Sequence, residues 1–202
     1  MIRLILVRHG QTDWNVQRRY QGHTDTRLNT VGKRQAEQIA ARLVNIDIDT
    51  IYASDLQRAW ETATTIAKKL ALSPIPEPRL REMKFGVIEG LTFDEAQARY
   101  PEMIATWLAD RNQPPTNGET LAAFSERIYP ILDHLRHNHD GETVLLVAHG
   151  GPLLEIIRTL LRMPPTGRWY FKLNNASITQ ITLHDDTPVL QHLNDICHLR
   201  EE

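Results

Sequence analysis

The sequence has few of the features that mark several large classes of protein. Only one of its 202 residues, Cys197, is a cysteine, which excludes an internal disulfide and a zinc-ribbon framework. We expect this lone thiol to be a small buried side chain. The longest apolar runs, such as Val144–Ala148, are far shorter than the ~20 residues that a membrane helix needs. The amino-terminal segment lacks a signal-peptide core, so we expect a cytoplasmic protein.

Neither sign of charge dominates the chain. Lysine and arginine together number 23 and the acidic residues 25, which gives a net charge of −2 and argues against a nucleic-acid partner. The charged and hydrophobic fractions, 24% and 41%, are typical of a globular chain, so we expect a single domain over residues 1–202. A near-neutral total can still contain a local cationic pocket, because the stretch from Arg3 to Arg27 holds five arginines and two aspartates.

Signatures of other enzyme classes are also absent. The chain contains no Gly-x-Ser-x-Gly elbow of a serine esterase, no HExxH metal motif and no glycine-rich nucleotide loop. The cluster of His134, His137 and His139 falls at a predicted helix end, where the helix dipole favours histidine without any metal. We therefore expect neither a metal ion nor a cofactor.

Short apolar runs alternate with helical patterns along the chain. Leu4–Val7 and Thr143–Ala148 have no polar face, which is typical of strands buried on both sides. The other predicted strands are Ile51–Ala53, Ser177–Leu183 as an edge or antiparallel strand, and Val189–Leu193. A first helix is predicted to be capped by Asn29 or Thr30 and to have Ala36, Ile39, Ala40 and Leu43 on one face. The other predicted helices are residues 56–70, 92–111 with a break at Pro101, 120–137 and 152–161. Residues 11–28 are predicted to be a long loop, and residues 73–78 a proline-rich break. This order predicts an α/β domain of three layers, with helices on both faces of a mostly parallel sheet.

Two of these predicted strands are followed by the same dipeptide. His9-Gly10 follows the first strand, and His149-Gly150 follows the strand Thr143–Ala148. Because ligands of open α/β sheets bind at the carboxyl ends of the strands, both histidines are candidates for one site. Pro152 opens a helix directly after the second, and its amino terminus would favour an anion there.

Two arginines are expected near the same crevice. Arg8 precedes His9, and Arg58 lies in the first turn of the helix after Ile51–Ala53. Guanidinium groups bind phosphate, and a neutral imidazole can attack phosphorus, so the set suits phosphoryl transfer through histidine. Each residue also has a plain structural interpretation: a core histidine, a solvated helix arginine and, for Glu82, an ordinary surface carboxylate.

Residues 6–15, Leu-Val-Arg-His-Gly-Gln-Thr-Asp-Trp-Asn, resemble the signature of the histidine phosphatase superfamily, also called the phosphoglycerate mutase-like family. Further blocks resemble the family in the same order: Gln21-Gly22 with Asp25 and Leu28-Asn29; Ser54 to Ala59 with Glu61-Thr62-Ala63; Leu80-Arg81-Glu82 with Phe85-Gly86 and Glu89-Gly90; Asn117 to Thr120; and Val147 to Gly151. The resemblance covers essentially the whole chain. It implies the family fold, with residues 91–118 as a small helical cap over the carboxyl ends of the strands.

The resemblance also implies a role for each matching residue. His9 would become phosphohistidine, Glu82 would protonate the leaving oxygen, and three residues would bind the phosphoryl oxygens: Arg8, Arg58 and His149. Four more would line the phosphate or substrate side: Asn15, Gln21, Gly22 and Gly150. The two close imidazoles would titrate as a pair, and a protonated His149 beside a neutral His9 is expected to help as a cation.

The site chemistry alone does not separate a phosphatase from a mutase. The family's mutases have a larger insertion after the Glu82 block, whereas here Leu91–Gly118 is short, so we favour a phosphatase of the broad-specificity or α-ribazole phosphate kind. A phosphoglycerate mutase is the alternative, and a non-catalytic phospholigand-binding module ranks third. Ile88 stands where the family often has tryptophan, which leaves the shape of the substrate open. A homodimer is left open too, since Trp169-Tyr170-Phe171 can be core or a subunit contact, with core favoured.

Overall fold

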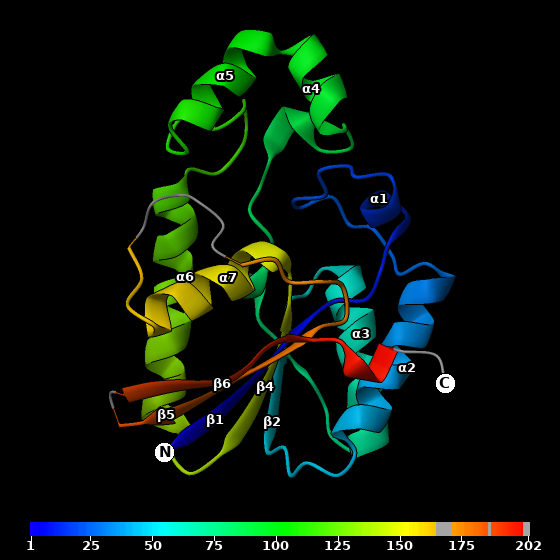
Figure 1. Ribbon diagram of the computed structural model, residues 1–202, viewed down its shortest axis with the longest axis vertical. Coiled ribbons are helices and arrows are strands. Elements are labelled where there is room, and N and C mark those ends of the chain that lie inside the picture. Colours follow the sequence, from blue (N-terminus) through cyan, green and yellow to red (C-terminus); the bar gives the residue numbers. More distant parts are fainter. Residues whose placement is uncertain (165–170, 186, 200–202) are drawn as a thin grey trace.

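The central element of the fold is a six-stranded mixed sheet with the strand order β3-β2-β4-β1-β5-β6 (Figure 1). The computed structural model describes residues 1–164, 171–185 and 187–199. The strands are β1 (Ile2–Arg8), β2 (Thr50–Ala53), β3 (Ile75–Pro76), β4 (Thr143–Ala148), β5 (Ile178–His184) and β6 (Thr187–Asp195). The strands β3, β2, β4 and β1 run parallel to one another, while β5 and β6 are each antiparallel to their neighbours. The predicted mostly parallel sheet is therefore confirmed.

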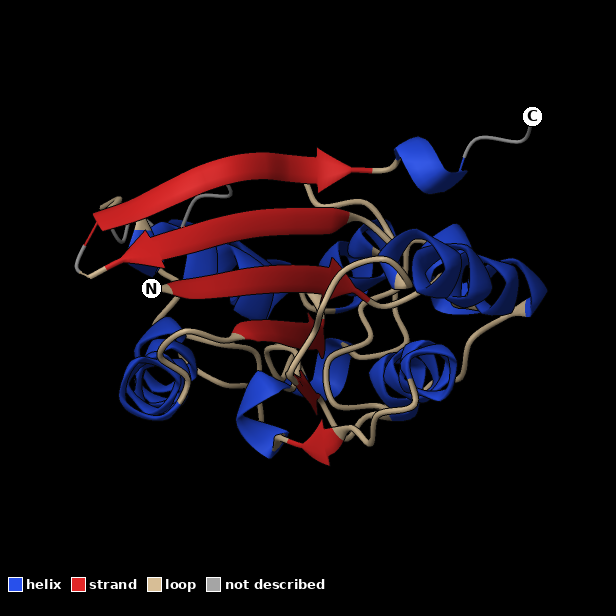
Figure 2. Cartoon of the chain, turned by 90° about the horizontal axis from the view of Figure 1, so that it is seen from below, coloured by secondary structure: helices blue, strands red, loops and turns tan. Residues whose placement is uncertain are grey.

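Four long helices cover the two faces of this sheet (Figure 2). They are α2 (Thr30–Leu43), α3 (Gln57–Leu70), α6 (Leu121–Asn138) and α7 (Gly150–Leu160). Alternate residues of β1 and β4 point to opposite sides. Leu4 and Leu6 pack with the residues of α6 and α7, whereas Ile5 and Val7 pack with those of α2 and α3. The three-layer architecture expected from the sequence results from this alternation.

The strand β4 is buried along its whole length, because it pairs with β1 on one side and β2 on the other and has helices above and below. This burial explains why its sequence has no polar face. The strand β1 is nearly as buried and pairs with β4 in parallel from Arg3↔Thr143 to Arg8↔Ala148. The two strands thus end side by side.

Two shorter helices, α4 (Phe93–Arg99) and α5 (Pro101–Ala109), lie beyond the carboxyl end of the sheet (Figure 1). Pro101 occupies the first turn of α5, which agrees with the predicted break. The pair has a small apolar core of its own, built from Ile88, Ala96, Ile104 and Trp107. Ile88, the departure from the family pattern, is fully buried in this core.

The structure differs from the sequence-based expectations in three details. The proline-rich segment contains the short strand β3, tolerated because it lies at the sheet edge, where a missing N–H interrupts no ladder. The expected loop contains the short helix α1 (Asp13–Val16). The strand β5 is antiparallel to both of its neighbours, in agreement with the expected edge or antiparallel strand, and β6 forms the edge. Cys197 is exposed, so the expectation of a buried thiol was wrong; it lies in a short 3₁₀ helix after the last strand, where no core covers it.

Two remaining expectations concern the aromatic residues 169–171 and the lack of a membrane helix. Trp169 and Tyr170 lie outside the described residues, whereas Phe171 is partly buried against the core beside α6 and α7. Within the described ranges, no helix combines the length and the apolar composition that a bilayer crossing requires.

Candidate functional site

The two histidines predicted to share a site lie together at the carboxyl ends of β1 and β4. The rings of His9 and His149 have centroids 5.1 Å apart and are tilted by 60° to one another. Both side chains are almost completely buried. The register of the two strands, in which Arg8 is opposite Ala148, places the residues after them side by side.

The ring of His9 is oriented by its own turn. Its Nδ1 atom lies 2.7 Å from the carbonyl oxygen of Gly10 and can only donate there, so the neutral ring has its proton on Nδ1 and a lone pair on Nε2. Burial lowers the pKa of His9 well below its usual value, and the positive charges of Arg58 and Arg8 lower it further. His9 is therefore a neutral imidazole at pH 7, with Nε2 available as a nucleophile.

The ring of His149 has protein partners at both nitrogens. Nδ1 accepts a hydrogen bond of 3.1 Å from Nε of Arg58, and Nε2 lies 2.8 Å from the hydroxyl oxygen of Ser54. An acceptor at Nδ1 requires a neutral ring, since an imidazolium has no lone pair there. Burial, followed by the charge of Arg58, also lowers the pKa of His149 well below its usual value. The expected protonated His149 is thus wrong for this arrangement, and the positive charge of the site comes from arginine.

Arg58 is the most deeply held of these cations. It lies in the first turn of α3 and is fully buried. Besides the bond to His149, NH2 donates to the carbonyl oxygen of Gly22 at 2.7 Å, and NH1 donates to that of Thr24 at 2.9 Å. Burial lowers the pKa of Arg58 to about 10, so it remains charged at neutral pH. Gly22, predicted to line the phosphate, here uses its carbonyl to fix this guanidinium.

Arg8, the second cation, has an unused donor. NH1 bonds to the carbonyl oxygen of Leu173 at 2.5 Å, but Nε is buried and has no hydrogen-bond partner among the described residues. Burial lowers the pKa of Arg8, and the carboxylate of Glu82 partly opposes this shift. A buried, unsatisfied N–H of a charged group is costly, which makes Arg8 a strong candidate for an anion ligand.

Glu82 reaches the same place from the segment before α4. One carboxylate oxygen accepts from the backbone N–H of Met83 at 2.9 Å, and the other accepts from that of Gly151 at 3.2 Å. A Cβ atom at Gly151 would lie only 2.1 Å from this carboxylate, so a side chain at that position would displace the acid. At Gly150, the predicted ligand, a Cβ would meet Arg8 and Glu82 at ordinary contact distances of 3.8 and 3.9 Å.

The two predicted amide ligands are oriented by hydroxyl and amide donors. Oδ1 of Asn15 accepts from the backbone N–H of Thr12 at 3.0 Å and from Nδ2 of Asn175 at 3.1 Å. Oε1 of Gln21 accepts from the hydroxyls of Thr12 and Thr26, at 3.0 and 2.7 Å. With both oxygens occupied in this way, the NH₂ group of each amide is the part left for an oxyanion.

The predicted set is thus brought together, but several residues that organise it had no assigned role in the sequence-based prediction. Thr62 accepts from the backbone N–H of Gly10 at 3.1 Å. The carboxylate of Glu89 accepts from the backbone N–H groups of His23 and Thr24, at 3.1 and 2.9 Å, and so shapes the loop that holds Arg58. Ser54, Thr62 and Glu89 lie within the motif blocks, which was a usable signal. Asn175 had none, because its contacts are to residues about 160 positions away.

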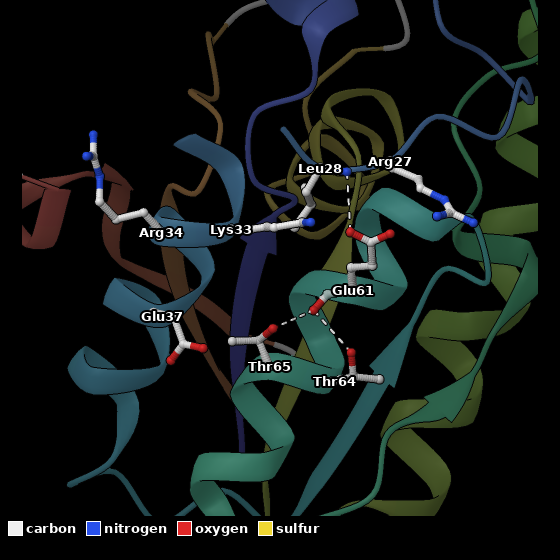
Figure 3. A pocket seen from close by; sticks show the side chains of 8 residues that line it. All are labelled: Arg27, Leu28, Lys33, Arg34, Glu37, Glu61, Thr64 and Thr65. Carbon is white, nitrogen blue, oxygen red and sulfur yellow. Dashed lines mark hydrogen bonds between the residues drawn. The ribbon is translucent and has the colours of Figure 1, made fainter. Parts of the chain in front are cut away.

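A separate groove of about 490 Å³ lies between α2 and α3 (Figure 3). Its lining is mixed in charge and contains none of the predicted site residues: Arg27, Leu28, Lys33, Arg34, Glu37, Glu61, Thr64 and Thr65. Across the described ranges, no group of three His, Cys, Asp or Glu side chains is arranged to hold a metal ion.

Comparison with known proteins shows which family and which relatives this chain resembles. A family model, described as the histidine phosphatase superfamily (branch 1), matches residues 4–196. Phosphoserine phosphatase 1 of Hydrogenobacter thermophilus is 35% identical over 100% of this chain and 96% of its own length. Phosphoglycerate mutase-like protein 4 of Arabidopsis thaliana is 37% identical, over 98% and 87%. The crystal structure of the α-ribazole phosphatase from Shigella flexneri has a TM-score of 0.89 at 31% identity, covering 96% of both chains.

Proposed function

This chain belongs to branch 1 of the histidine phosphatase superfamily, and we propose that it hydrolyses small phosphomonoesters through a phosphohistidine formed on His9. One observation supports this proposal above the others. A neutral imidazole with a free Nε2 lone pair is buried beside two guanidinium groups, those of Arg8 and Arg58. The buried Nε of Arg8 has no partner among the described side chains and backbone groups, so an oxyanion would supply the missing acceptor.

In the first proposed step, Nε2 of His9 attacks the phosphorus atom and the bond from phosphorus to the ester oxygen breaks. Protonated Glu82 gives its proton to that leaving oxygen, which departs as an alcohol. Arg8 and Arg58 hold the phosphoryl oxygens and stabilise their charge. As the new P–N bond forms, positive charge develops on the ring, and the Nδ1–H bond to the Gly10 carbonyl stabilises it.

In the second step, the carboxylate of Glu82 removes a proton from water, and the oxygen of that water attacks phosphorus. The P–N bond breaks, its electron pair returns to Nε2, and hydrogen phosphate leaves. The proton that Glu82 gave to the alcohol is thus replaced from water, and His9 returns to its starting state. His149 acts in both steps by orienting Arg58 through the bond between its Nδ1 atom and Nε of Arg58.

Hydrolysis is favoured over the mutase alternative by the small cap. A mutase must exclude water and hold the second anionic group of its substrate. Residues 91–118 contain two arginines, and both stack on aromatic rings of the cap: Arg99 lies 5.3 Å from the Tyr100 ring centroid, and Arg111 lies 4.0 Å from that of Trp107. They do not form an adjacent pair that could grip a second phosphate. The non-catalytic alternative is disfavoured because the residues proposed as nucleophile, acid and cations lie together, as catalysis would require.

A panel of phosphomonoesters tests the proposal. Phosphoserine, α-ribazole phosphate, phosphoglycerate and an aryl phosphate are assayed for free phosphate and for isomerised product, with and without a chelator. Release of phosphate should dominate, and the chelator should leave the rate unchanged. Dominant isomerisation of phosphoglycerate would instead support the mutase, and loss of activity with the chelator would contradict a metal-free mechanism.

One finer prediction accompanies this proposal. The protein is expected in the cytoplasm, in keeping with its single cysteine and a small phosphorylated substrate. This prediction does not depend on the mechanism above.

A further inference from the structure

Residues 173–177, just before β5, cross the turn that carries the nucleophile. Within residues 173–177, the backbone N–H of Ala176 donates to the carbonyl oxygens of Arg8 and His9, at 3.0 and 3.1 Å. The carbonyl oxygen of Ser177 accepts from the backbone N–H of Arg8 at 3.2 Å. Ala176 is buried and has a φ of +59°, a left-handed conformation that is uncommon outside glycine and persists where the surroundings impose it.

One side chain of this segment contacts the site directly. Nδ2 of Asn175 lies 3.1 Å from Oδ1 of Asn15 and 3.2 Å from the carbonyl oxygen of His9. It also lies 3.5 Å from the carbonyl oxygen of Gly10, the acceptor of the His9 ring proton. All three neighbours are acceptors, so the contact requires a donor, which the amide NH₂ group supplies.

We propose that Asn175 is a positioning residue for phosphoryl transfer, which sets the His9 turn and the Asn15 amide at the same time. This inference rests on the proposed function. By donating to Oδ1, Asn175 helps keep the oxygen of the Asn15 amide turned inward and its NH₂ group free for a phosphoryl oxygen. By donating its other hydrogen to the carbonyl of His9, 3.2 Å away, it steadies the turn that orients the imidazole. Asn175, from the last quarter of the chain, therefore fixes the position of the His9 nucleophile relative to the Asn15 phosphate ligand.

A packing role and a donor role predict opposite results for two substitutions. Asn175→Asp keeps the shape but replaces the donor with a carboxylate facing three oxygen atoms, whereas Asn175→Ala only removes the donor. A packing role therefore makes the aspartate variant the milder one, and the donor role makes it the more damaging one. Lowering the pH protonates the introduced carboxyl group and restores an O–H donor, so the activity of Asn175→Asp relative to wild type should rise as the pH falls.

The experiment measures kcat/KM and phosphoenzyme formation with an aryl phosphate for wild type, Asn175→Ala, Asn175→Asp and the matched control Asn174→Ala. The neighbouring Asn174 makes its described contacts through the backbone, to Asn194 and Ser177, and these survive the control substitution. We expect Asn175→Ala to lose about tenfold to a hundredfold in kcat/KM. Asn175→Asp should lose more at pH 7, and Asn174→Ala should match wild type.

A double-mutant cycle with Asn15→Ala gives a second readout. If Asn175 acts partly through Asn15, its substitution should cost several-fold less in that background than in wild type. Equal activity of Asn175→Ala and Asn174→Ala, fully multiplicative losses in the cycle, or a milder Asn175→Asp would each overturn the inference. If Asn175→Ala does not fold, the isosteric Asn175→Asp and its pH dependence still decide the matter. A wild-type chain without phosphomonoesterase activity would contradict the proposed function; an active one with unaffected Asn175 variants contradicts this inference alone.

Discussion

The two histidine turns begin from nearly the same sequence and are used in different ways. Each comes after a buried parallel strand and precedes a glycine, and the two rings lie 5.1 Å apart. His9 bonds through Nδ1 to its own turn and leaves Nε2 free. His149 bonds to Arg58 through one nitrogen and to Ser54 through the other. The strand and the dipeptide place an imidazole at the crevice, but its partners determine what it can do.

The chain beyond each turn also differs. After His149 the helix α7 begins at once, and the backbone N–H of Gly151 in its first turn holds the carboxylate of Glu82. After His9 the chain continues as a loop, and the turn is held from outside by Thr62 and by the segment around Asn175. The second turn is thus built into regular structure, while the first depends on distant parts of the chain.

The largest expected effect comes from replacing His9 and His149 separately by alanine. His9→Ala should lower turnover by on the order of 10⁶-fold, the scale of loss when a covalent nucleophile is removed, and should abolish the phosphoenzyme. His149→Ala should lower it by about 10²- to 10³-fold, as for loss of one stabilising group, because Arg58 loses its acceptor. Rapid-quench measurement of phosphoprotein separates the two, since the His149 variant should still form it. Equal losses, or phosphoprotein in His9→Ala, would remove the distinction between the turns.

A smaller effect tests the acid held by the second turn. Glu82→Gln cannot protonate the leaving oxygen, so phosphoenzyme formation from an alkyl phosphate should slow by about 10²- to 10⁴-fold. An aryl phosphate with an acidic leaving group needs less protonation, and its phosphoenzyme should form at a rate much closer to wild type. The measurement is the rate of phosphoenzyme formation from each substrate, because the second step, in which Glu82 activates water, is common to both. The exposed Glu126→Gln, on the outer side of α6, is the control. An equal loss on both substrates would argue that Glu82 serves another purpose.

Much of the fold was predictable because it depends on local patterns. The unbroken apolar runs of β1 and β4 indicated burial on both faces, and Pro101 marked the boundary between α4 and α5. The strand β3 was missed because two residues with a proline carry no strand signal of their own. The exposure of Cys197 was not predicted, because the expectation came from the usual burial of cysteine. This residue lies beyond the last strand, where no repeating apolar pattern supports burial.

The residues that meet at the site were predictable from the sequence, but the protonation state of His149 was not. The motif blocks predicted a histidine phosphatase and named the residues that meet at the crevice, and the family membership is confirmed. The charge of His149 was not predictable, because it depends on Nε of Arg58 lying 3.1 Å from Nδ1, a contact between residues 91 positions apart. The contacts of Asn175 with the His9 turn were not predictable for the same reason. Sequence names the groups at the end of a strand, whereas hydrogen-bond direction depends on which partners the fold brings against them.

The smallest expected effect concerns the dependence of stability on pH. Both buried imidazoles have a pKa below the usual value of about 6.5 in the folded chain, so below pH 6.5 the unfolded chain binds protons that the folded chain does not. The folded state should therefore lose stability as the pH falls below 6.5, and these two groups should have no effect above it. Each contributes up to about 1.4 kcal/mol per pH unit, or roughly 3–6 °C in Tm. His149→Asn should show a shallower fall in Tm between pH 6.5 and 5 than wild type, with exposed His192→Asn as the control for losing a histidine. An unchanged slope in His149→Asn would mean that His149 is charged in the folded protein, and the two turns would then differ less than their hydrogen bonds indicate.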